Sequence, residues 1–505
     1  MIRFILNDRL VETGLSPGSS LLDFIRYEQQ LPGTKIGCRE GDCGACTVLE
    51  GKLENNRMVY RSITSCLSPL GNAHGKHIVS VEGLNMDRLS PIQEAFVVEN
   101  ATQCGFCTPG FVVALSGYAM DYAKAEPTGA VDSMNGNICR CTGYKSIERA
   151  AVSVARLLKE KDPQHPLRWL VDEGFLPGYF MQIPERIQAL GDLSALQTDL
   201  NDVSSFVPGE SETAENNVGS PIRKVILGGG TDLMVQKPDE VSQADPVLVF
   251  DAEELKGIRR DGGRMVIGAA ATANDIMHSP LIEAVFPDVR RHFKLVSSDP
   301  IRNMGTLGGN LVNASPIADL VIYFMVMDPL LQIRHPETGR IRETALKDFF
   351  LDYKKLDLHP GELVINLSFD IPENPFLFNF EKVSKRTHLD IASVNAAALI
   401  RETEGKVTLC RLSCGGVGPT PVFLKETSRF LSGKEITVPH LLAAEKILQE
   451  EISPISDIRG SERYKRLLAG QLLFAHFLRY FPGRLKIGDL IRGGEPGYTT
   501  NNTGK

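Results

Sequence analysis

The sequence predicts a multidomain α+β protein, on the basis of three observations. The chain has 505 residues, which is more than a single hydrophobic core usually supports, so we expect three or four domains. Eight of its ten cysteines lie before residue 142 in two groups of four, the first among short strand-like segments and the second among helical ones. Beyond residue 222, hydrophobic strands alternate with helical stretches around two glycine-rich loops.

The first domain is expected over residues 1–82 as a small mixed sheet. Ile2–Leu6 and Leu10–Glu12 flank a short Asn-Asp turn, which indicates a β-hairpin, and a short helix begins at Leu21. Two further strands are expected, over residues 47–50 and 57–62.

This domain contains the first cysteine quartet, which consists of Cys38, Cys43, Cys46 and Cys66. The spacing C-x4-C-x2-C…C is typical of a plant-type ferredoxin cluster. Four glycines punctuate the loop, as a backbone wrapped closely around an inorganic cluster requires. A structural zinc site is the alternative, but zinc usually takes C-x2-4-C pairs that are far apart in sequence.

A helical domain is expected over residues 83–162, where the hydrophobic period changes from two to 3.6 residues. Its helices are predicted over residues 91–100, 109–125, 131–136 and 146–161. The second quartet consists of Cys104, Cys107, Cys139 and Cys141. These two close pairs suit a cluster held between helix N-termini, although a zinc site is a more credible alternative here than for the first quartet. Two clusters in one chain imply that electrons pass through it.

The remaining chain is divided by composition. We expect a linker at 163–174, an α/β or α+β domain at 175–352, a C-terminal domain at 376–485 and a tail at 486–505. The second of these begins with a strand over 180–184 and contains a polar insertion at about 200–222, expected to be an exposed loop.

Two glycine-rich loops of the third domain carry its chemistry. A strand runs into Gly228–Gly230, followed by Thr231 and Asp232, and this pattern lacks the G-x-G-x-x-G of a Rossmann fold. The second loop contains Thr306–Asn310, with Asp319 beyond it. A plain tight turn is the alternative for the first loop alone, but two such loops can embrace the halves of a dinucleotide. Because iron–sulfur clusters pass electrons singly, a flavin is expected rather than a nicotinamide.

Composition excludes several classes of function. The formal net charge is −7 with no basic stripe, which argues against a nucleic-acid partner. No apolar run approaches the roughly 20 residues that a spanning helix needs, and the start of the chain lacks the features of a secretory signal, so no membrane association is expected. A long chain with its cysteines at metal-ligand spacings is expected to be cytoplasmic.

The motifs GCREGDCGACTV, QCGFCTPG, NICRCTGY, GGGTDL and GTLGGNLVNASPIADL occur in this order. In that order they resemble the iron–sulfur and flavin subunit of the xanthine dehydrogenase family of molybdenum hydroxylases, in its bacterial, two-subunit form. The resemblance covers residues 1–485. It implies a ferredoxin-like β-grasp domain, a four-helix 2Fe-2S domain, an FAD domain of the vanillyl-alcohol oxidase (PCMH) type and an α/β C-terminal flavoprotein domain.

The same resemblance implies the site residues. The first quartet would hold the 2Fe-2S cluster nearer FAD, and the second quartet the one nearer molybdenum, with Gln103 and Cys141 near the pterin. The implied FAD-binding residues are Ile226, Leu227, Gly228, Gly229, Gly230, Thr231, Asp232, Leu233, Thr306, Leu307, Gly308, Gly309, Asn310, Asp319 and Lys382. No residue of this chain is expected to be catalytic in the hydroxylation.

The function implied is electron transfer from molybdopterin on a large partner subunit, through both clusters and FAD, to NAD or another acceptor, in a heterotetramer or larger assembly. Leu389 stands beside Asp390 where NAD-using relatives carry a polar side chain, which puts NAD in doubt. Alternatives are a subunit of an aldehyde, nicotinate or other heterocycle dehydrogenase, or a free-standing flavin-linked carrier. Cys410 and Cys414 are expected to be buried structural thiols, and His388 a solvated loop residue.

Overall fold

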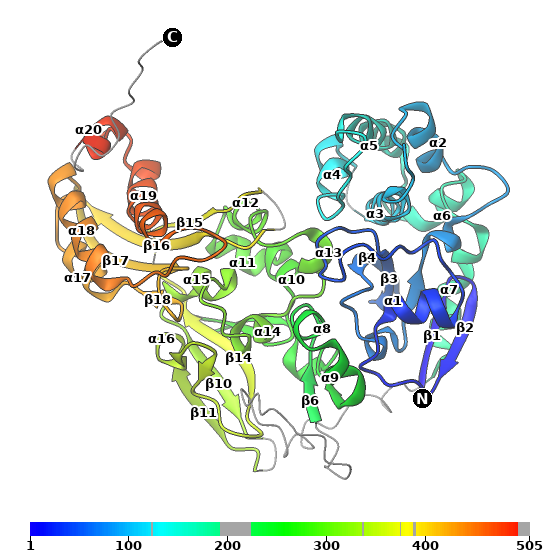
Figure 1. The fold of residues 1–505 in the computed structure, drawn as a ribbon, viewed down its shortest axis with the longest axis horizontal. Coiled ribbons are helices and arrows are strands. Elements are labelled where there is room, and N and C mark those ends of the chain that lie inside the picture. The colour runs from blue at the N-terminus through cyan, green and yellow to red at the C-terminus, as the bar shows by residue number, and fades with distance from the viewer. Residues whose placement is uncertain (123–124, 192–223, 336–337, 374, 387–389, 493–505) are drawn as a thin grey trace.

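The computed structural model describes residues 1–122, 125–191, 224–335, 338–373, 375–386 and 390–492. The polar insertion, His388 and Leu389 lie outside these ranges, as does the end of the expected tail. Figure 1 shows four parts: a small sheet, a helical bundle beside it, a central region of mixed structure and a C-terminal sheet covered by helices. The multidomain α+β prediction is therefore confirmed.

The N-terminal part, called here the sheet domain, is a five-stranded sheet of order β2-β1-β5-β3-β4. Its elements are β1 (Ile2–Leu6), β2 (Arg9–Thr13), α1 (Leu21–Asp23), η1 (Phe24–Glu28), β3 (Thr47–Glu54), β4 (Arg57–Thr64) and β5 (His77–Val79). β1 and β5 are parallel, and the other pairs are antiparallel. The β3–β4 hairpin turns at Asn55 and Asn56, both with positive φ, as the tight turns favoured in hairpins require.

The helical domain contains the four helices that the sequence predicts, α2 (Pro91–Val98), α3 (Thr108–Met120), α4 (Pro127–Asp132) and α5 (Lys145–Leu157). Ser90 and Gln93 form a capping box at the start of α2. α3 is buried on most of its surface because it lies between the other helices and the sheet domain. α4 begins four residues before the predicted start, at Pro127, a residue suited to a first helical turn.

Residues 163–190 differ from the prediction. The expected linker contains the helix α6 (Pro166–Asp172), and the expected strand at 180–184 is instead a 3₁₀ turn (Gly178–Gln182) followed by α7 (Ile183–Gln188). The strand prediction was wrong because Phe180, Ile183 and Ile187 recur at helical spacing and bury one face against the helical domain. Among the described residues, this segment therefore packs in the core of the helical domain.

The third part, called here the pocket domain, has two sheets. One is the parallel pair β6 (Lys224–Leu227) and β7 (Asp245–Leu248). The other has the order β11-β10-β14-β9-β8 and consists of β8 (Ile258–Asp261), β9 (Arg264–Gly268), β10 (Leu330–Arg334), β11 (Ile341–Ala345) and β14 (Leu363–Asp370). A small hairpin joins β12 (Phe350–Asp352) to β13 (Lys355–Leu356).

The helices of the pocket domain are short and lie between and beside its sheets. They are α8 (Leu233–Gln236), α9 (Pro238–Gln243), α10 (Ala273–His278), α11 (Pro280–Val285), α12 (Val289–Phe293), α13 (Asp299–Arg302), α14 (Leu307–Val312), α15 (Asp319–Met325) and α16 (Leu346–Phe349). Six of the seven residues of α15 are buried, so this helix forms the centre of the core.

The C-terminal domain is an antiparallel sheet of order β15-β16-β17-β18, covered by helices. Its elements are β15 (Leu377–Val383), β16 (Val394–Thr403), β17 (Lys406–Gly415), β18 (Val422–Phe423), α17 (Lys425–Leu431), α18 (Val438–Glu451), α19 (Glu462–Tyr480) and α20 (Ile487–Arg492). Cys410 and Cys414 are both buried in its core, as expected, and burial raises the pKa of Cys414 to about 12.

A buried ion network joins the sheet domain to the pocket domain. Lys76 Nζ lies 3.0 Å from Glu50 Oε2 and 2.8 Å from Asp251 Oδ2, and its side chain is only 3% exposed. Lys52 and Lys256 contact the other oxygen of Asp251 at 3.0 and 2.7 Å. Burial alone would lower the pKa of Lys76, but Asp251 and Glu50 outweigh it and raise the pKa. The network therefore holds a fully charged lysine between two domains.

Replacing Lys76 by methionine is expected to destabilise the native protein by about 3–5 kcal/mol, because Glu50 is left buried without its cation. Lys52→Met removes a more exposed partner of Asp251 and should cost about 1 kcal/mol or less. Urea unfolding followed by the fluorescence of Trp169, the single tryptophan, measures both changes. An equal decrease in the free energy of unfolding of the two variants would show that the burial of Lys76 does not determine the size of the effect.

Candidate functional site

The first cysteine quartet lies where the sheet domain meets the pocket domain. Cys38, Cys43 and Cys46 occupy the loop before β3, and Cys66 follows β4. Cys46 and Cys66 are buried, while Cys38 and Cys43 are half-buried. Cys66 follows the other three cysteines by 20 to 28 positions, and the β3–β4 hairpin brings it back to the same site.

Glycine is required in this loop for two reasons. Gly41 and Gly44 have φ values of 75° and 65°, in the left-handed region that favours glycine. A Cβ at Gly37 would lie 2.6 Å from Cys43 Sγ, so the backbone passes close to the sulfur atoms. The loop can therefore surround a group larger than a single ion.

In each quartet the thiols associate in pairs. Cys38 hydrogen-bonds Cys43, and Cys46 hydrogen-bonds Cys66. The hydrogen bond from Cys43, and then the amides of Glu40, Cys43 and Asp42, lower the pKa of Cys38 to about 5 despite its burial. A thiolate at this position is the form that binds iron.

The second quartet repeats this arrangement. Cys141 Sγ donates to Cys104 Sγ at 3.5 Å, and Cys107 hydrogen-bonds Cys139. In the part of the chain that the structure describes, no three His, Cys, Asp or Glu side chains converge as the ligands of one ion would. Two pairs of cysteines per site suit a cluster in which each of two irons takes two protein ligands.

Exposure differs between the two quartets. Cys104 and Cys141 are exposed at the surface of the helical domain, together with Gln103. Phe106 and Tyr144 beside them are 47% and 39% exposed. One edge of the second site therefore faces solvent.

The two cysteine loops are in direct contact. The amide of Ile138, next to Cys139, donates to the carbonyl of Cys43 at 3.0 Å. Asn137 Nδ2 donates to the carbonyl of Gly44 at 2.9 Å. The two cysteine-bearing segments are thus joined by hydrogen bonds that lie within two residues of a cysteine on each side.

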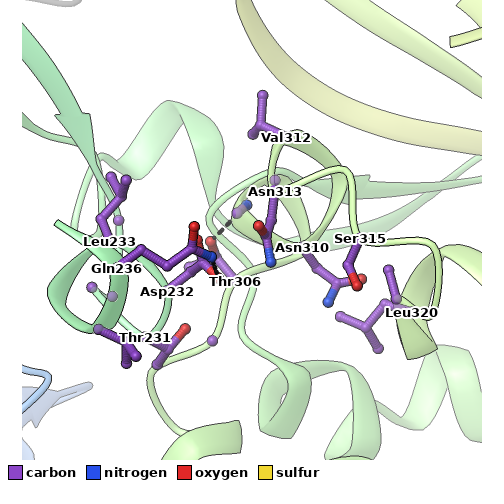
Figure 2. Close-up of a pocket in the computed structure, with 18 of the residues that line it drawn as sticks. Thr231, Asp232, Leu233, Gln236, Thr306, Asn310, Val312, Asn313, Ser315 and Leu320 are labelled. Carbon is purple, nitrogen blue, oxygen red and sulfur yellow. Dashed lines mark hydrogen bonds between the residues drawn. The ribbon is translucent and has the colours of Figure 1, made fainter. Parts of the chain in front are cut away.

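A cavity of about 1520 Å³ lies between the two glycine-rich loops of the pocket domain, and residues of the sheet domain and the C-terminal domain also line it. Such a volume exceeds the roughly 300–1,000 Å³ of common small-molecule pockets and suits a dinucleotide. Figure 2 shows side chains of the first loop and α8, including Asp232 and Gln236, opposite Thr306 and Asn310 of the second loop. The prediction that the loops embrace one site therefore agrees with their arrangement.

Thirteen of the fifteen residues predicted to bind FAD line this cavity. They are Ile226, Leu227, Gly228, Gly229, Gly230, Thr231, Asp232, Leu233, Thr306, Gly308, Gly309, Asn310 and Asp319. Leu307 is instead fully buried in the core behind the second loop. Lys382 is not among the lining residues, but its Nζ lies 2.6 Å from Asp319 Oδ2 and 2.8 Å from the carbonyl of Leu295. Lys382 thus orients a lining carboxylate.

The two loops approach each other closely. A Cβ at Gly229 would lie 1.8 Å from the carbonyl oxygen of Met304, and Thr306 Oγ1 accepts a hydrogen bond from the amide of Gly309 at 3.1 Å. Asn310 Oδ1 is buried and has no hydrogen-bond partner among the described residues. A bound polar ligand would satisfy this atom, so the cavity fits a dinucleotide such as FAD.

Two cationic residues that line the cavity, Lys354 and Arg302, were not predicted from the sequence. Lys354, from the β12–β13 hairpin, donates to Asn313 Oδ1 at 2.6 Å. Burial raises the pKa of Asp232, and Lys354, Gln236 and Asn313 offset part of this effect. Arg302 lines the cavity from α13 and is 3% exposed. No local pattern in the sequence marks Lys354 or Arg302, since both reach the cavity through packing.

The first quartet borders the cavity. Glu40, Asp42 and Leu67, which lie within two residues of cysteines of this quartet, are lining residues. Asn72 Nδ2 of the sheet domain donates to the carbonyl of Gly228 at 2.9 Å. The sheet domain therefore docks directly on the first glycine loop.

Four family models match consecutive parts of the chain. They are the 2Fe-2S iron–sulfur cluster binding domain (residues 4–70), the [2Fe-2S] binding domain (80–152), the FAD binding domain in molybdopterin dehydrogenase (206–373) and the CO dehydrogenase flavoprotein C-terminal domain (380–480). The expected cofactors of this chain, two 2Fe-2S clusters and FAD, are confirmed by these matches.

Individual relatives are more distant. Xanthine dehydrogenase from Emericella nidulans is 28% identical over 489 residues, covering 87% of this chain and 36% of the relative. Aldehyde oxidase 1 from Bos taurus is 26% identical over 528 residues, covering 94% and 39%. The chain thus spans less than half the length of the curated relatives it matches.

Among solved structures, a chain of reconstituted CO dehydrogenase from Oligotropha carboxidovorans is 26% identical, with a TM-score of 0.48, and the match covers 52% of this chain and 91% of that one. Among the described residues, no helix is long and apolar enough to cross a membrane. The chain therefore combines two 2Fe-2S domains, an FAD domain of the type found in molybdopterin dehydrogenases and a flavoprotein C-terminal domain of the CO dehydrogenase type, in this order.

Proposed function

We propose that this chain is the electron-transfer subunit of a cytoplasmic hydroxylase resembling xanthine dehydrogenase. Electrons released at molybdopterin on a large partner subunit would enter at the second quartet, pass to the first quartet and reach FAD. They would leave to NAD or another acceptor. Relatives that carry the name xanthine dehydrogenase support this proposal, such as the one from Emericella nidulans, which is 28% identical to this chain.

The residue assignments belong to the same proposal. Each 2Fe-2S cluster supplies a one-electron carrier, and FAD accepts electrons singly and releases them in pairs. Cys38 and Cys43 would bind one iron of the first cluster, and Cys46 and Cys66 the other. Pairing of the thiols gives the matching assignment for the second cluster, with Cys104 and Cys141 on one iron and Cys107 and Cys139 on the other.

One observation carries the direction of transfer. The second site has two exposed cysteines, its loop is hydrogen-bonded to the first cysteine loop, and the first loop lines the cavity. This order runs from the surface to the flavin, so the surface site is where an electron-donating partner would dock. Phe106 and Tyr144 supply the exposed aromatic side chains that are enriched at protein interfaces.

The chain's own residues determine how the cofactors are held. The amides of Glu40, Asp42 and Cys43 donate toward Cys38, and such hydrogen bonds to sulfur tune the potential of a cluster. Lys382 and Asn395 both donate to Asp319, which fixes its carboxylate at the edge of the cavity. No proton transfer by this chain is needed for a hydroxylation that takes place on the partner.

A second candidate is the equivalent subunit of an aldehyde or N-heterocycle dehydrogenase, or of a CO dehydrogenase. This second candidate is supported by the similarity to aldehyde oxidase 1 from Bos taurus, which is 26% identical over 94% of this chain. The substrate is chosen by the partner in every one of these cases.

The decisive experiment purifies the native complex and determines its metals, its cofactors and its subunits. We expect a larger molybdopterin protein in a heterotetramer or larger assembly, and turnover of xanthine with NAD or with an artificial dye. Turnover with the dye alone would retain the electron-transfer role and reject NAD. Oxidation of another heterocycle or an aldehyde but not of xanthine would favour the second candidate, and a protein without a molybdopterin partner would reject both.

A further inference from the structure

A short segment of the pocket domain touches every part of the proposed electron path. The segment comprises α13 (Asp299–Arg302) and the two residues that follow, Asn303 and Met304, and is called here the α13 junction. Figure 1 shows α13 beside β4 of the sheet domain and below the helical domain. Neither cysteine quartet nor glycine loop includes it.

The first two residues of the α13 junction contact the helical domain close to the second quartet. The amide of Asp299 donates to Asn135 Oδ1 at 2.9 Å, and a Cβ at Gly136 would lie 2.9 Å from Pro300 Cδ. Asn135 and Gly136 lead directly into the segment that carries Cys139. The α13 junction thus fixes the loop of the second cluster.

The next contacts are to the sheet domain around the first quartet. A Cβ at Gly41, between Cys38 and Cys43, would lie 2.7 Å from Ile301 Cδ1. Asn303 Nδ2 donates to the carbonyl of Ser62 at 2.9 Å, four residues before Cys66. Met304 accepts a hydrogen bond from Thr64 at its sulfur and meets Gly229 at its carbonyl. The same six residues therefore also fix the first cluster loop and the first glycine loop.

Arg302 connects this joint to the wall of the flavin cavity. Its Nη1 donates to the carbonyls of Val296 and Ser297, each at 3.0 Å, and both of these residues line the cavity. Ser297 has a φ of 50°, a conformation that only surrounding contacts maintain in a residue other than glycine.

The other donors of the same guanidinium bind side chains. Nε donates to Asn274 Oδ1 at 3.0 Å, and Nη2 lies 3.4 Å from Asp299 Oδ1. The planar, forked guanidinium can reach all these acceptors at once, whereas a lysine has a single nitrogen.

We propose that Arg302 is a positioning residue for electron transfer between the first cluster and FAD, because it locks the α13 junction to the cavity wall and so fixes the distance between the two cofactors. This inference rests on the proposed electron path. In each transfer the cluster is oxidised by one electron and the flavin is reduced by one, and Arg302 itself neither gains nor loses an electron or proton.

The test uses the full chain loaded with both clusters and FAD, as wild type, Arg302→Lys, Asn303→Ala and the control Arg334→Lys. Arg334 is a largely buried arginine of the same domain that pairs with Glu254, far from the α13 junction in sequence. A flash-generated viologen radical donates one electron to a cluster, and the flavin absorbance then reports the transfer rate. Hydrogen exchange over residues 296–304 is measured on the same samples.

We expect the cluster-to-flavin rate to fall several-fold in Arg302→Lys and in Asn303→Ala, with faster exchange confined to residues 296–304 and unchanged cofactor content. Arg334→Lys should keep the wild-type rate. A wild-type cluster-to-flavin rate in both junction variants would overturn the inference. If Arg302→Lys loses FAD, its rate cannot be measured, and a wild-type rate in Asn303→Ala would then be enough to overturn the inference. Absence of flavin reduction in the wild type would instead overturn the proposed function.

Discussion

Replacing Cys46 by serine is expected to remove the first cluster while leaving the second cluster and FAD in place. Iron should fall from about four atoms per chain to about two, because each 2Fe-2S cluster needs four cysteine ligands. Cys46 is buried and hydrogen-bonded to Cys66, and serine is similar in size, so the fold should survive. Iron analysis and the EPR spectrum of the reduced protein measure the loss.

The functional consequence should be complete. The first quartet is the one that borders the flavin cavity, so an electron given to the second cluster should no longer reduce FAD in Cys46→Ser. Cys414→Ser is the matched control, because this cysteine is equally buried but lies in the C-terminal domain. Four irons and normal flavin reduction in Cys46→Ser would contradict the ligand assignment, and loss of iron in Cys414→Ser would show that the effect is not specific.

Replacing Gly229 by alanine is expected to weaken FAD binding strongly. The new Cβ would lie 1.8 Å from the carbonyl oxygen of Met304, and that backbone cannot yield easily because the amides of Met304 and Gly305 both donate to the carbonyl of Ile301. The first glycine loop would have to move into the cavity. Overpacking of this kind costs about 1–3 kcal/mol, which corresponds to roughly 5- to 150-fold in affinity.

The measurement is a titration of FAD into protein from which the flavin has been removed, with iron content as a check of the N-terminal domains. Gly263→Ala is the matched control, since a Cβ at Gly263, in the turn between β8 and β9, would have no atom within 4 Å. Wild-type affinity in Gly229→Ala would mean that the two loops are not locked together as the contacts indicate.

Local features of the fold were the easiest to predict from the sequence. The spacing of each quartet, the four helices around the second quartet and the glycine motifs after β6 and at the start of α14 were all predictable, because they depend on neighbouring residues. The strand predicted at 180–184 failed, since a short apolar run with a proline was given strand character when its hydrophobic residues recur at helical spacing. The strands β8 and β11 were not predicted because runs of four and five residues carry little periodicity, and the eight-residue strand β14 was also missed.

Some residues that line the cavity could be predicted from local motifs, and others could not. Thirteen lining residues could be predicted because they lie in two continuous motifs that match the flavin-binding positions of the family that the sequence resembles. Lys354 and Arg302 could not, because a hairpin and a short helix far along the chain bring them to the cavity. Lys76 is a further example: a lysine is usually exposed, and only its partners Glu50 and Asp251 explain its burial.

The sequence by itself thus determined the cofactor set, since the spacing of cysteines and glycines along the covalent chain limits which groups the loops can surround. Only the tertiary structure decided how the cofactor sites are ordered and joined. The pairing of Cys46 with Cys66, the hydrogen bond from Ile138 to Cys43 and the contacts of the α13 junction link residues 20 to more than 200 positions apart. Such contacts depend on the simultaneous packing of several domains, which no local pattern specifies.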